Sequence, residues 1–271
     1  MAETEQQRSK RRRRRTLFDG VAELYAACRP GYPAEIIEFL TATAGVGPGS
    51  RVLEVGCGTG QLTKGLAHYG FDLSAIDIGP ALIAAAQDGL AEAAISFQVC
   101  SFEEFAAADA SFDLIVSATA FHWVDPEVKV SKSARLLRPG GWLALLSAER
   151  LYDDRLAAAL RQMWIARSEE WARNAWSTMK PQVDADATAI ADSGLFGQLV
   201  HRTYERRATV PADTVLGVEN TRASSLSWPP DACQAFTEEL RSHLGSLAQV
   251  PVTEQTFLMS TAIEGSAGIG N

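Results

Sequence analysis

The stretch Leu53–Thr63, LEVGCGTGQLT, places three glycines in five positions directly after an apolar run. The residues Arg51–Val55 have the composition of a buried strand, and those after Gly60 have that of a helix start. The glycines therefore lie in a turn from strand to helix, where the backbone bends tightly or lets another group come close. A strand, a glycine-rich turn and a helix in this order indicate an α/β protein that binds a ligand at the turn.

Strands and helices alternate on both sides of this turn. Further strands are predicted at 72–77, 95–100, 112–118 and 141–147, and helices at 61–69, 80–92, part of 102–106, and 126–137. Alternation at this spacing predicts βαβ units and a mostly parallel sheet. Two short helices, broken at the sequence RPGYP of residues 29–33, are expected before the first strand.

The second half of the chain follows a different pattern. Apolar residues at helical intervals, among them Leu156, Leu160 and Trp164, predict a long amphipathic helix or a helix pair over 151–180. A strand near 198–208, helices near 211–218 and 230–245, and a last strand within 253–263 are predicted after it. Residues 266–271 are expected to be a frayed tail.

Composition excludes several classes of protein. The chain has 271 residues, of which 46% are hydrophobic and 21% charged, as in ordinary globular domains. No apolar run approaches the roughly 20 residues that span a bilayer, and no secretory segment follows the start, so we expect a soluble, cytoplasmic protein. The four cysteines form no CxxC pair and the four histidines have no ligand spacing, which predicts free thiols and no metal site.

The charge is distributed unevenly along the chain. The formal net charge is −8, but residues 1–15 carry seven basic and two acidic side chains, which leaves −13 on the remainder. We interpret the run KRRRRR, residues 10–15, as part of a basic disordered tail, with docking to RNA, an anionic surface or an acidic partner as the alternative. Residues 16–265 are then one domain, and removal of residues 1–15 is expected to leave turnover of a small molecule intact.

The residues around the glycines indicate the kind of ligand. Gly56 and Gly58 remove the Cβ atoms that keep a ligand off the backbone, and Gly60 lets the helix begin close to the strand. Glu54 precedes the first glycine by two residues, where a carboxylate disfavours a pyrophosphate and favours an amino group or a sulfonium. Asp77 ends the second strand, where a carboxylate can accept hydrogen bonds from both hydroxyls of a ribose. The spacing favours a nucleoside with a cationic tail over a dinucleotide.

Four motifs in order resemble one family. VLEVGCGTG, AIDIGPALIAAA, FDLIVSATAFHW and LLRPGGWLALLS are similar to the class I S-adenosylmethionine-dependent methyltransferases, especially the branch of trans-aconitate and ubiquinone-biosynthesis enzymes. The resemblance runs from about residue 18 to 147. It implies a Rossmann-like, doubly wound, seven-stranded sheet with an antiparallel last strand. It also implies a helical N-terminal segment and a helical lid or insert after the fifth strand, at about 151–192.

The resemblance also implies roles for individual residues. S-adenosyl-L-methionine is the expected methyl donor, with S-adenosyl-L-homocysteine as its product and no metal. Ser101 replaces the usual aspartate at the end of the third strand, so the resemblance does not establish a contact between Ser101 and adenine. The backbone N–H of Phe102 can donate to the adenine ring instead. The residues expected at the donor are Tyr25, Arg29, Glu54, Gly56, Cys57, Gly58, Gly60, Asp77, Ile78, Ser101, Phe102 and Ala118.

Methyl transfer from a sulfonium needs mainly positioning and exclusion of water, so a conspicuous catalytic cluster is not required. His122 is the best candidate for a general base, with a structural histidine beside Trp123 as the alternative. Arg29 is predicted to pair with a carboxylate of the donor or acceptor, or else to hold the backbone. Tyr32, Trp123 and Trp164 are the predicted substrate residues, although Trp164, with Trp171 and Trp176, can equally be core.

The favoured function is methylation of a small-molecule acceptor. The main alternative is a methyltransferase of RNA or protein that docks through the basic run, although the acidic body makes nucleic acid an unexpected partner. A nucleotide-binding oxidoreductase and a non-catalytic binding protein are further alternatives, and the glycine spacing and Asp77 disfavour them. The sequence specifies neither the acceptor nor the methylated atom, and a monomer and a homodimer are both compatible with it.

Overall fold

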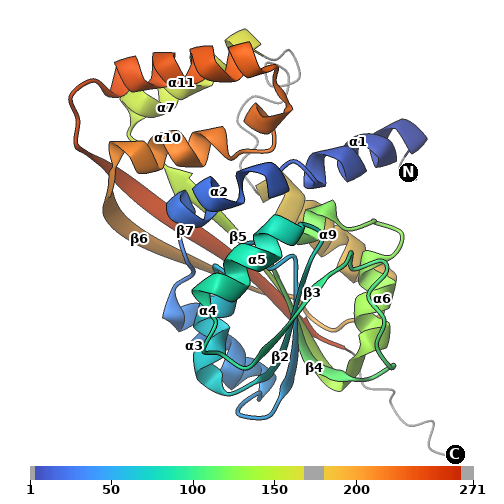
Figure 1. Ribbon diagram of the computed structural model, residues 1–271. Coiled ribbons are helices and arrows are strands. Elements are labelled where there is room, and N and C mark those ends of the chain that lie inside the picture. The colour runs from blue at the N-terminus through green and yellow to red at the C-terminus, as the bar shows by residue number, and fades with distance from the viewer. Residues whose placement is uncertain (1–3, 168–179, 264–271) are drawn as a thin grey trace, which may run out of the picture.

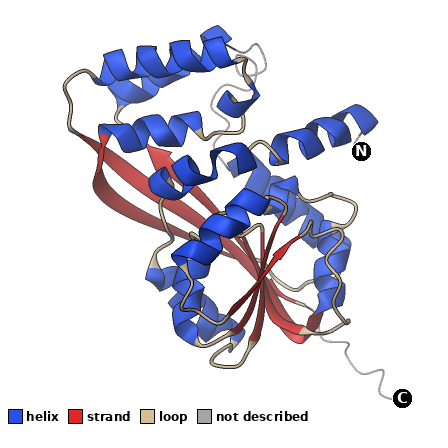
Figure 2. Ribbon diagram, viewed as in Figure 1, coloured by secondary structure: helices blue, strands red, loops and turns tan. Residues whose placement is uncertain are grey.

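A single seven-stranded sheet organises the protein, which a computed structural model describes over residues 4–167 and 180–263 (Figures 1 and 2). The strand order is β3-β2-β1-β4-β5-β7-β6. The strands β1 to β5 run parallel to one another, while β7 is antiparallel to both β5 and β6. The strands are β1 (Arg51–Val55), β2 (Asp72–Asp77), β3 (Ile95–Val99), β4 (Phe112–Ala118), β5 (Leu137–Leu151), β6 (Val200–Pro211) and β7 (Gln249–Ala262).

This topology confirms the predicted fold class. The order reverses between β1 and β4, because the chain first builds outward through β2 and β3 and then returns to the other side of β1. A crevice forms at such a reversal, beyond the carboxyl ends of the strands. The turn after β1 and the loop after β4 therefore border the same space.

Helices cover both faces of the sheet. Alternate residues of β1 point to opposite faces, so that Val52 joins a core cluster with α3 and α4 while Leu53 joins one that includes Ile190 of α9. Figure 1 shows α3, α4 and α5 on one side of the sheet and α6 and α9 on the other. The helices on the two faces are α3 (Ala34–Ala44), α4 (Thr63–Leu66), α5 (Pro80–Gly89), α6 (Lys129–Leu136) and α9 (Lys180–Ser193).

The strands β5, β7 and β6 extend past the rest of the sheet and carry a separate helical layer (Figure 2). β4 pairs with β5 only as far as Leu146, whereas β7 continues to pair with β5 up to Leu151. Side chains of α7, α10, α11 and β7 form a third buried cluster there, in which Phe236 and Trp164 are large members. These helices are α7 (Asp154–Arg167), α10 (Ala212–Asn220) and α11 (Pro230–Leu244).

The N-terminal segment differs from the expected disordered tail. The basic residues belong to α1 (Glu5–Arg15), which begins at a capping box between Thr4 and Gln7. A second short helix, α2 (Ala22–Cys28), follows and packs against α10. A run of like charges does not by itself indicate a helix, and in the structure Arg11 and Arg15 of α1 pair with Asp125 and Glu103.

Smaller predictions had mixed outcomes. Part of 102–106 was predicted helical, but residues 102–104 form a turn. The four cysteines are free thiols, with Cys28 and Cys57 buried. The predicted tail at 266–271 and the tryptophans Trp171 and Trp176 lie outside the described residues. Over the part of the chain that is described, none of the helices has the length and apolar character needed to cross a membrane.

Candidate active site

Two pockets meet where the strand order reverses. The first, here the Asp77 pocket, has a volume of about 700 Å³, and the second, the Arg150 pocket, about 910 Å³. Ile78, Leu82 and Phe102 give the Asp77 pocket an apolar wall. The two pockets share a wall made of Tyr25, Gly56, Gly58, Ala118 and Thr119. A ligand can therefore extend from one pocket into the other past the ends of β1 and β4.

Asp77 holds the glycine turn in place from the end of β2. Its carboxylate accepts hydrogen bonds from the backbone N–H of Gly58 at 2.9 Å and of Gly79 at 3.0 Å. Burial raises the pKa of Asp77 above its usual value, although these two bonds oppose the shift. The carboxylate lines the Asp77 pocket, and each oxygen has a second acceptor site for a hydroxyl group of a ligand.

The three glycines of the turn have different neighbours. A Cβ on Gly58 would meet only a side-chain oxygen of Gln61 at 3.8 Å, so this position is open to the pockets. A Cβ on Gly56 would lie 2.3 Å from the Cβ of Ala120, and one on Gly60 would contact α5. Gly60 therefore serves helix packing and lines neither pocket, which differs from its predicted place at the donor.

Glu54 presents a buried carboxyl group to the Arg150 pocket. The residue is 1% exposed, and its Oε2 atom has no hydrogen-bond partner in the described chain. Burial raises the pKa of Glu54 to about 8, and the nearby charge of Asp77 adds to this shift. An unpaired buried carboxyl is costly, and a cationic ligand group would satisfy it. The site thus fits a ligand with an amino or sulfonium group.

Thr119 is a site residue that the sequence did not reveal. It follows β4 and has a left-handed backbone, with φ of 56°, which is strained for a threonine. Its hydroxyl forms a hydrogen bond of 2.9 Å with the Tyr32 hydroxyl and accepts one of 3.3 Å from the backbone N–H of Ala148. A place directly after a strand is only a weak sign of a site residue, and no sequence pattern predicts a threonine with a left-handed backbone.

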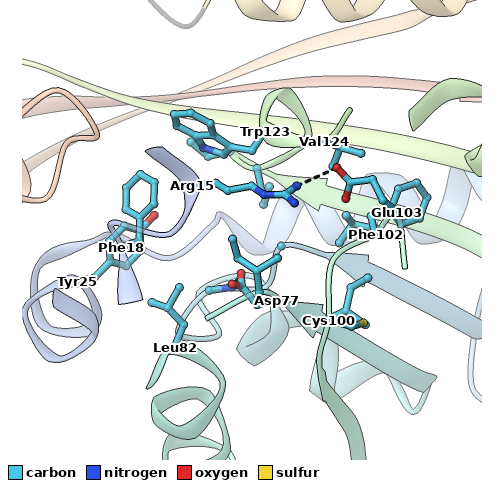
Figure 3. A pocket seen from close by; sticks show the side chains of 18 residues that line it. Arg15, Phe18, Tyr25, Asp77, Leu82, Cys100, Phe102, Glu103, Trp123 and Val124 are labelled. Carbon is cyan, nitrogen blue, oxygen red and sulfur yellow. Dashed lines mark hydrogen bonds and ion pairs between the residues drawn. The ribbon is translucent and has the colours of Figure 1, made fainter. Parts of the chain in front are cut away.

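The helix α1 closes one side of the Asp77 pocket. Arg15 lines the pocket and donates to Glu103 at 2.8 Å, as Figure 3 shows. Arg11 forms an ion pair with Asp125 at 3.2 Å and donates to the carbonyl of Trp123 at 3.0 Å. Burial opposes ionisation of Glu103, but backbone hydrogen bonding and Arg15 outweigh it, so its pKa is lowered. Two arginines of the basic run, Arg11 and Arg15, therefore pair with acidic residues at the rim of the pocket, whereas Arg12 and Arg13 are exposed.

Comparison with known proteins agrees with this geometry. Residues 53–145 match the family described as Methyltransferase domain. Residues 53–145 of this chain form a methyltransferase domain. The chain is 37% identical over 139 residues to an uncharacterized methyltransferase of Mycobacterium tuberculosis. The matched segment covers 51% of this chain and 54% of the relative. The chain is 36% identical over 124 residues to a ubiquinone biosynthesis O-methyltransferase of Xanthomonas campestris pv. campestris. This match covers 44% of this chain and 52% of the relative.

Solved structures extend the likeness of fold beyond the methyltransferase domain. A candidate type II methyltransferase of Anaeromyxobacter dehalogenans has a TM-score of 0.62 at 23% identity and covers 88% of this chain and 99% of its own. The Haemonchus contortus phosphoethanolamine N-methyltransferase 2 in complex with S-adenosyl-L-methionine has a TM-score of 0.53 at 15% identity, over 92% and 57%. This chain spans about half the length of the curated relatives that it matches.

Most residues that the sequence placed at the donor do line the joined pockets of the methyltransferase domain. Ser101 does not, because its hydroxyl donates to Glu104 at 2.8 Å and accepts from the Glu104 backbone at 3.2 Å within a tight turn. Lining residues from the predicted donor set are Tyr25, Arg29, Glu54, Gly56, Cys57, Gly58, Asp77, Ile78, Phe102 and Ala118.

The predicted substrate and catalytic residues are more scattered. Tyr32 lines the Arg150 pocket, whereas Trp123 lines the Asp77 pocket beside Phe18. Trp164 lines neither, because it is buried against Trp228 and Phe236 in the outer helical layer. His122 lines a separate small cavity, and burial lowers its pKa to about 4, so it is neutral at pH 7.

Arg29 has the structural role that the sequence left open. Its Nε donates to the Thr221 hydroxyl at 3.1 Å and its Nη2 to the Thr221 carbonyl at 2.8 Å, which ties α2 to α10. The residue also lines the Arg150 pocket, and its bonds to Thr221 involve only neutral oxygens. The two roles are compatible, because neutral oxygens orient the guanidinium without neutralising it.

Proposed function

We propose that this protein transfers a methyl group from S-adenosyl-L-methionine to a small-molecule acceptor. The observation that carries the proposal is a pair of carboxyl groups, the buried Glu54 and the half-buried Asp77, on either side of the open backbone at Gly58. Such a site suits a nucleoside at one end and a cationic amino acid at the other. The methyltransferase match of residues 53–145 supports the same reading.

The donor would lie across both pockets. Asp77 would accept hydrogen bonds from the ribose hydroxyls, with the adenine against Ile78 and Phe102 in the Asp77 pocket. Glu54 would pair with the amino group of the methionine part. Gly58 lies in the shared wall, where the absence of a side chain leaves room for the ligand beside the backbone.

The chemistry needs little from the protein beyond geometry. The bound donor supplies a methyl group on a positively charged sulfur, which an acceptor nucleophile takes in line as the carbon–sulfur electron pair returns to sulfur. The shared wall at Ala118 and Thr119 would hold the two reactants in line, and α1 and α2 would exclude water. The hydrogen bond between Tyr32 and Thr119 fixes this wall.

A general base at His122 stays a prediction, and the geometry weakens it. The imidazole lines a separate cavity and has a pKa of about 4, so it accepts a proton poorly near pH 7. An acceptor that is already ionised, such as a carboxylate, needs no base. Substitution of His122 by alanine would leave turnover of such an acceptor unchanged.

Binding of spent donor tests the proposal directly. S-adenosyl-L-homocysteine should raise the thermal unfolding midpoint of the protein in a concentration-dependent way, and NAD should not. A methyl-donor consumption assay against a panel of small acids, phenols and amines then identifies the acceptor. Stabilisation by NAD without stabilisation by S-adenosyl-L-homocysteine would favour an oxidoreductase and end the proposal. Turnover of RNA or protein alone would refute the small-molecule assignment.

A further inference from the structure

Arg150 is a buried cation whose hydrogen-bonding capacity is largely unused. The residue lies on β5, lines the Arg150 pocket and has a side chain only 5% exposed. Its Nη2 donates to the Glu254 carboxylate at 2.7 Å. Its Nε and Nη1 atoms are buried and have no hydrogen-bond partner in the described part of the chain. Leaving charged donors unpaired in the interior is costly, so the arrangement favours a ligand that accepts from them.

The carboxylate beside Arg150 is shared with a second arginine. Arg150, Glu254 and Arg206 are neighbours in register across β5, β7 and β6. The Oε1 atom of Glu254 accepts from Arg150, and its Oε2 atom accepts from Arg206. Burial opposes ionisation of Glu254, but the bonds from these two arginines outweigh it, so its pKa is lowered. One negative charge thus serves two positive ones, and Arg150 is only partly neutralised.

The other charged groups of the Arg150 pocket do not remove this excess. Arg222 is matched by Glu219 through bonds of 2.7 and 3.0 Å, and Glu149, which also lines the pocket, acts on Arg222 as well. Arg29 is bonded to the neutral oxygens of Thr221 and carries its charge into the same pocket. In the free protein Glu54 is mostly protonated at neutral pH, because burial raises its pKa to about 8, and in the complex the amino group of the donor would balance its charge.

The position of Arg150 separates it from the donor. β4 pairs with β5 only to Leu146, and Arg150 lies four residues further, on the extension that carries the outer helical layer (Figure 1). Glu54 also lines the Arg150 pocket, but it is in register with Ala144 of β5 through Val116 of β4, so Arg150 lies six residues further along β5. A ligand group at Arg150 therefore lies beyond the shared wall, on the side where the acceptor would enter.

We propose that Arg150 binds an oxyanion of the methyl acceptor, a carboxylate or a phosphate, and so selects anionic acceptors. The inference rests on the proposed methyl transfer, because it assigns to the second reactant the part of the Arg150 pocket that lies beyond the donor. The Nε and Nη1 hydrogens of Arg150 donate to the anion, and the charge of Arg29 adds a longer-range attraction. The bond to Glu254 keeps the guanidinium in place when the pocket is empty.

The test compares Arg150→Gln with Arg206→Gln. Both variants leave Glu254 with one arginine, but only Arg150 lines the pocket, so Arg206→Gln controls for the loss of an ion pair. The probes are carboxylic acids with their amides, and phosphate monoesters with their alcohols, titrated into protein saturated with S-adenosyl-L-homocysteine. The acid and phosphate arms distinguish the two anions. Turnover of each anion that binds is then measured with S-adenosyl-L-methionine.

Anions should bind the wild-type protein in preference to their neutral analogues. Arg150→Gln should weaken that binding and raise the KM of the anionic acceptor by about 10- to 100-fold, with a smaller change in kcat. Arg150→Lys should restore part of the loss, and Arg206→Gln should bind anions as the wild type does. Affinity for S-adenosyl-L-homocysteine should be the same in the wild type and all three variants.

Each other outcome contradicts a different statement. If Arg150→Gln loses S-adenosyl-L-homocysteine and keeps the anions, Arg150 binds the donor carboxylate instead. If Arg206→Gln weakens anion binding equally, Arg150 acts through Glu254 and the fold. If no anion of the panel binds preferentially to the wild-type complex, the inference is wrong while donor binding stands. If S-adenosyl-L-homocysteine itself does not bind, the proposed function fails first.

Discussion

Donor binding should release a proton from Glu54. The carboxyl group is buried, its Oε2 atom is unpaired, and its pKa in the free protein is about 8. At pH 7 about one tenth of Glu54 is then ionised, from the distance between pH and pKa. An ammonium or sulfonium group beside it favours the carboxylate, so the pKa of Glu54 falls in the complex. At pH 7 each binding event should release about 0.9 proton from this group.

The pH dependence follows with a definite sign. Because the carboxylate binds the cation better, donor affinity should rise with pH up to the free pKa of about 8, above which the donor's own amino group loses its proton. If the pKa in the complex is well below 6, affinity should increase about 50-fold between pH 6 and pH 8. The stability of the free protein should show the opposite pH dependence. A carboxyl with a raised pKa stabilises the fold fully below its unfolded pKa, and this stability is lost as pH rises through about 8.

Isothermal titration calorimetry of S-adenosyl-L-methionine in two buffers of different ionisation enthalpy measures the proton count. The control is Glu54→Gln, which removes the titration while keeping the shape. The donor's own amino group titrates near pH 8, and Asp77 and Cys57 remain nearby, but these groups are common to both proteins. The difference between the proteins therefore belongs to Glu54. Equal proton release and equal pH profiles in the two proteins would refute the reasoning.

Three further outcomes are expected. Gly58→Val should abolish binding of S-adenosyl-L-homocysteine in calorimetry. The control Gly45→Val, at a glycine with a similar positive φ and open surroundings, should bind it normally. Normal binding by both variants would show that Gly58 is not part of the site. Deletion of residues 1–15 should weaken donor binding several-fold and make it less dependent on salt, and unchanged affinity would show that α1 is not part of the pocket. Trp164→Ala should lower the free energy of unfolding by about 3–5 kcal/mol in denaturant titration without changing the KM of the folded enzyme, and a raised KM would return Trp164 to the substrate site.

The sequence predicted those parts of the fold that local pattern controls. The bounds of β1, β2 and β4 agree with the predicted strands, because each is a short apolar run between glycine, proline or polar residues. The order of the strands came instead from the resemblance to a known family. Pattern alone gives the number of βαβ units and leaves open on which side of β1 each strand is added.

The missed features depend on contacts between distant parts of the chain. The helix α1 is held by Glu103 and Asp125, which are about a hundred residues away, so the basic run could only be read as solvated. The left-handed backbone of Thr119 is sustained by Tyr32 and Ala148. The place of Trp164 was open because a helix with tryptophan at core spacing looks the same whether it faces a substrate or other helices.

The deletion of residues 1–15 shows how one such contact changes a functional expectation. As a solvated tail, the segment would be dispensable, but Arg15 lines the Asp77 pocket and bonds to its rim at Glu103. The same ion pairs occupy Arg11 and Arg15 of the basic run and leave Arg12 and Arg13 as its exposed arginines, so fewer basic groups are available for the RNA-docking alternative.

The charges of the site are sorted along its length. The carboxyl groups of Glu54 and Asp77 lie where the donor's cation and ribose are assigned, and the partly neutralised Arg150 lies beyond the shared wall. A cationic donor is attracted to the first group and repelled by the second, while an anionic acceptor experiences the reverse. Under the two proposals, opposite fields would therefore orient the two reactants before any contact at Gly58 and Thr119 is made. Methyl transfer also removes the donor's sulfonium charge, which weakens its attraction to Glu54 and favours release of the spent donor.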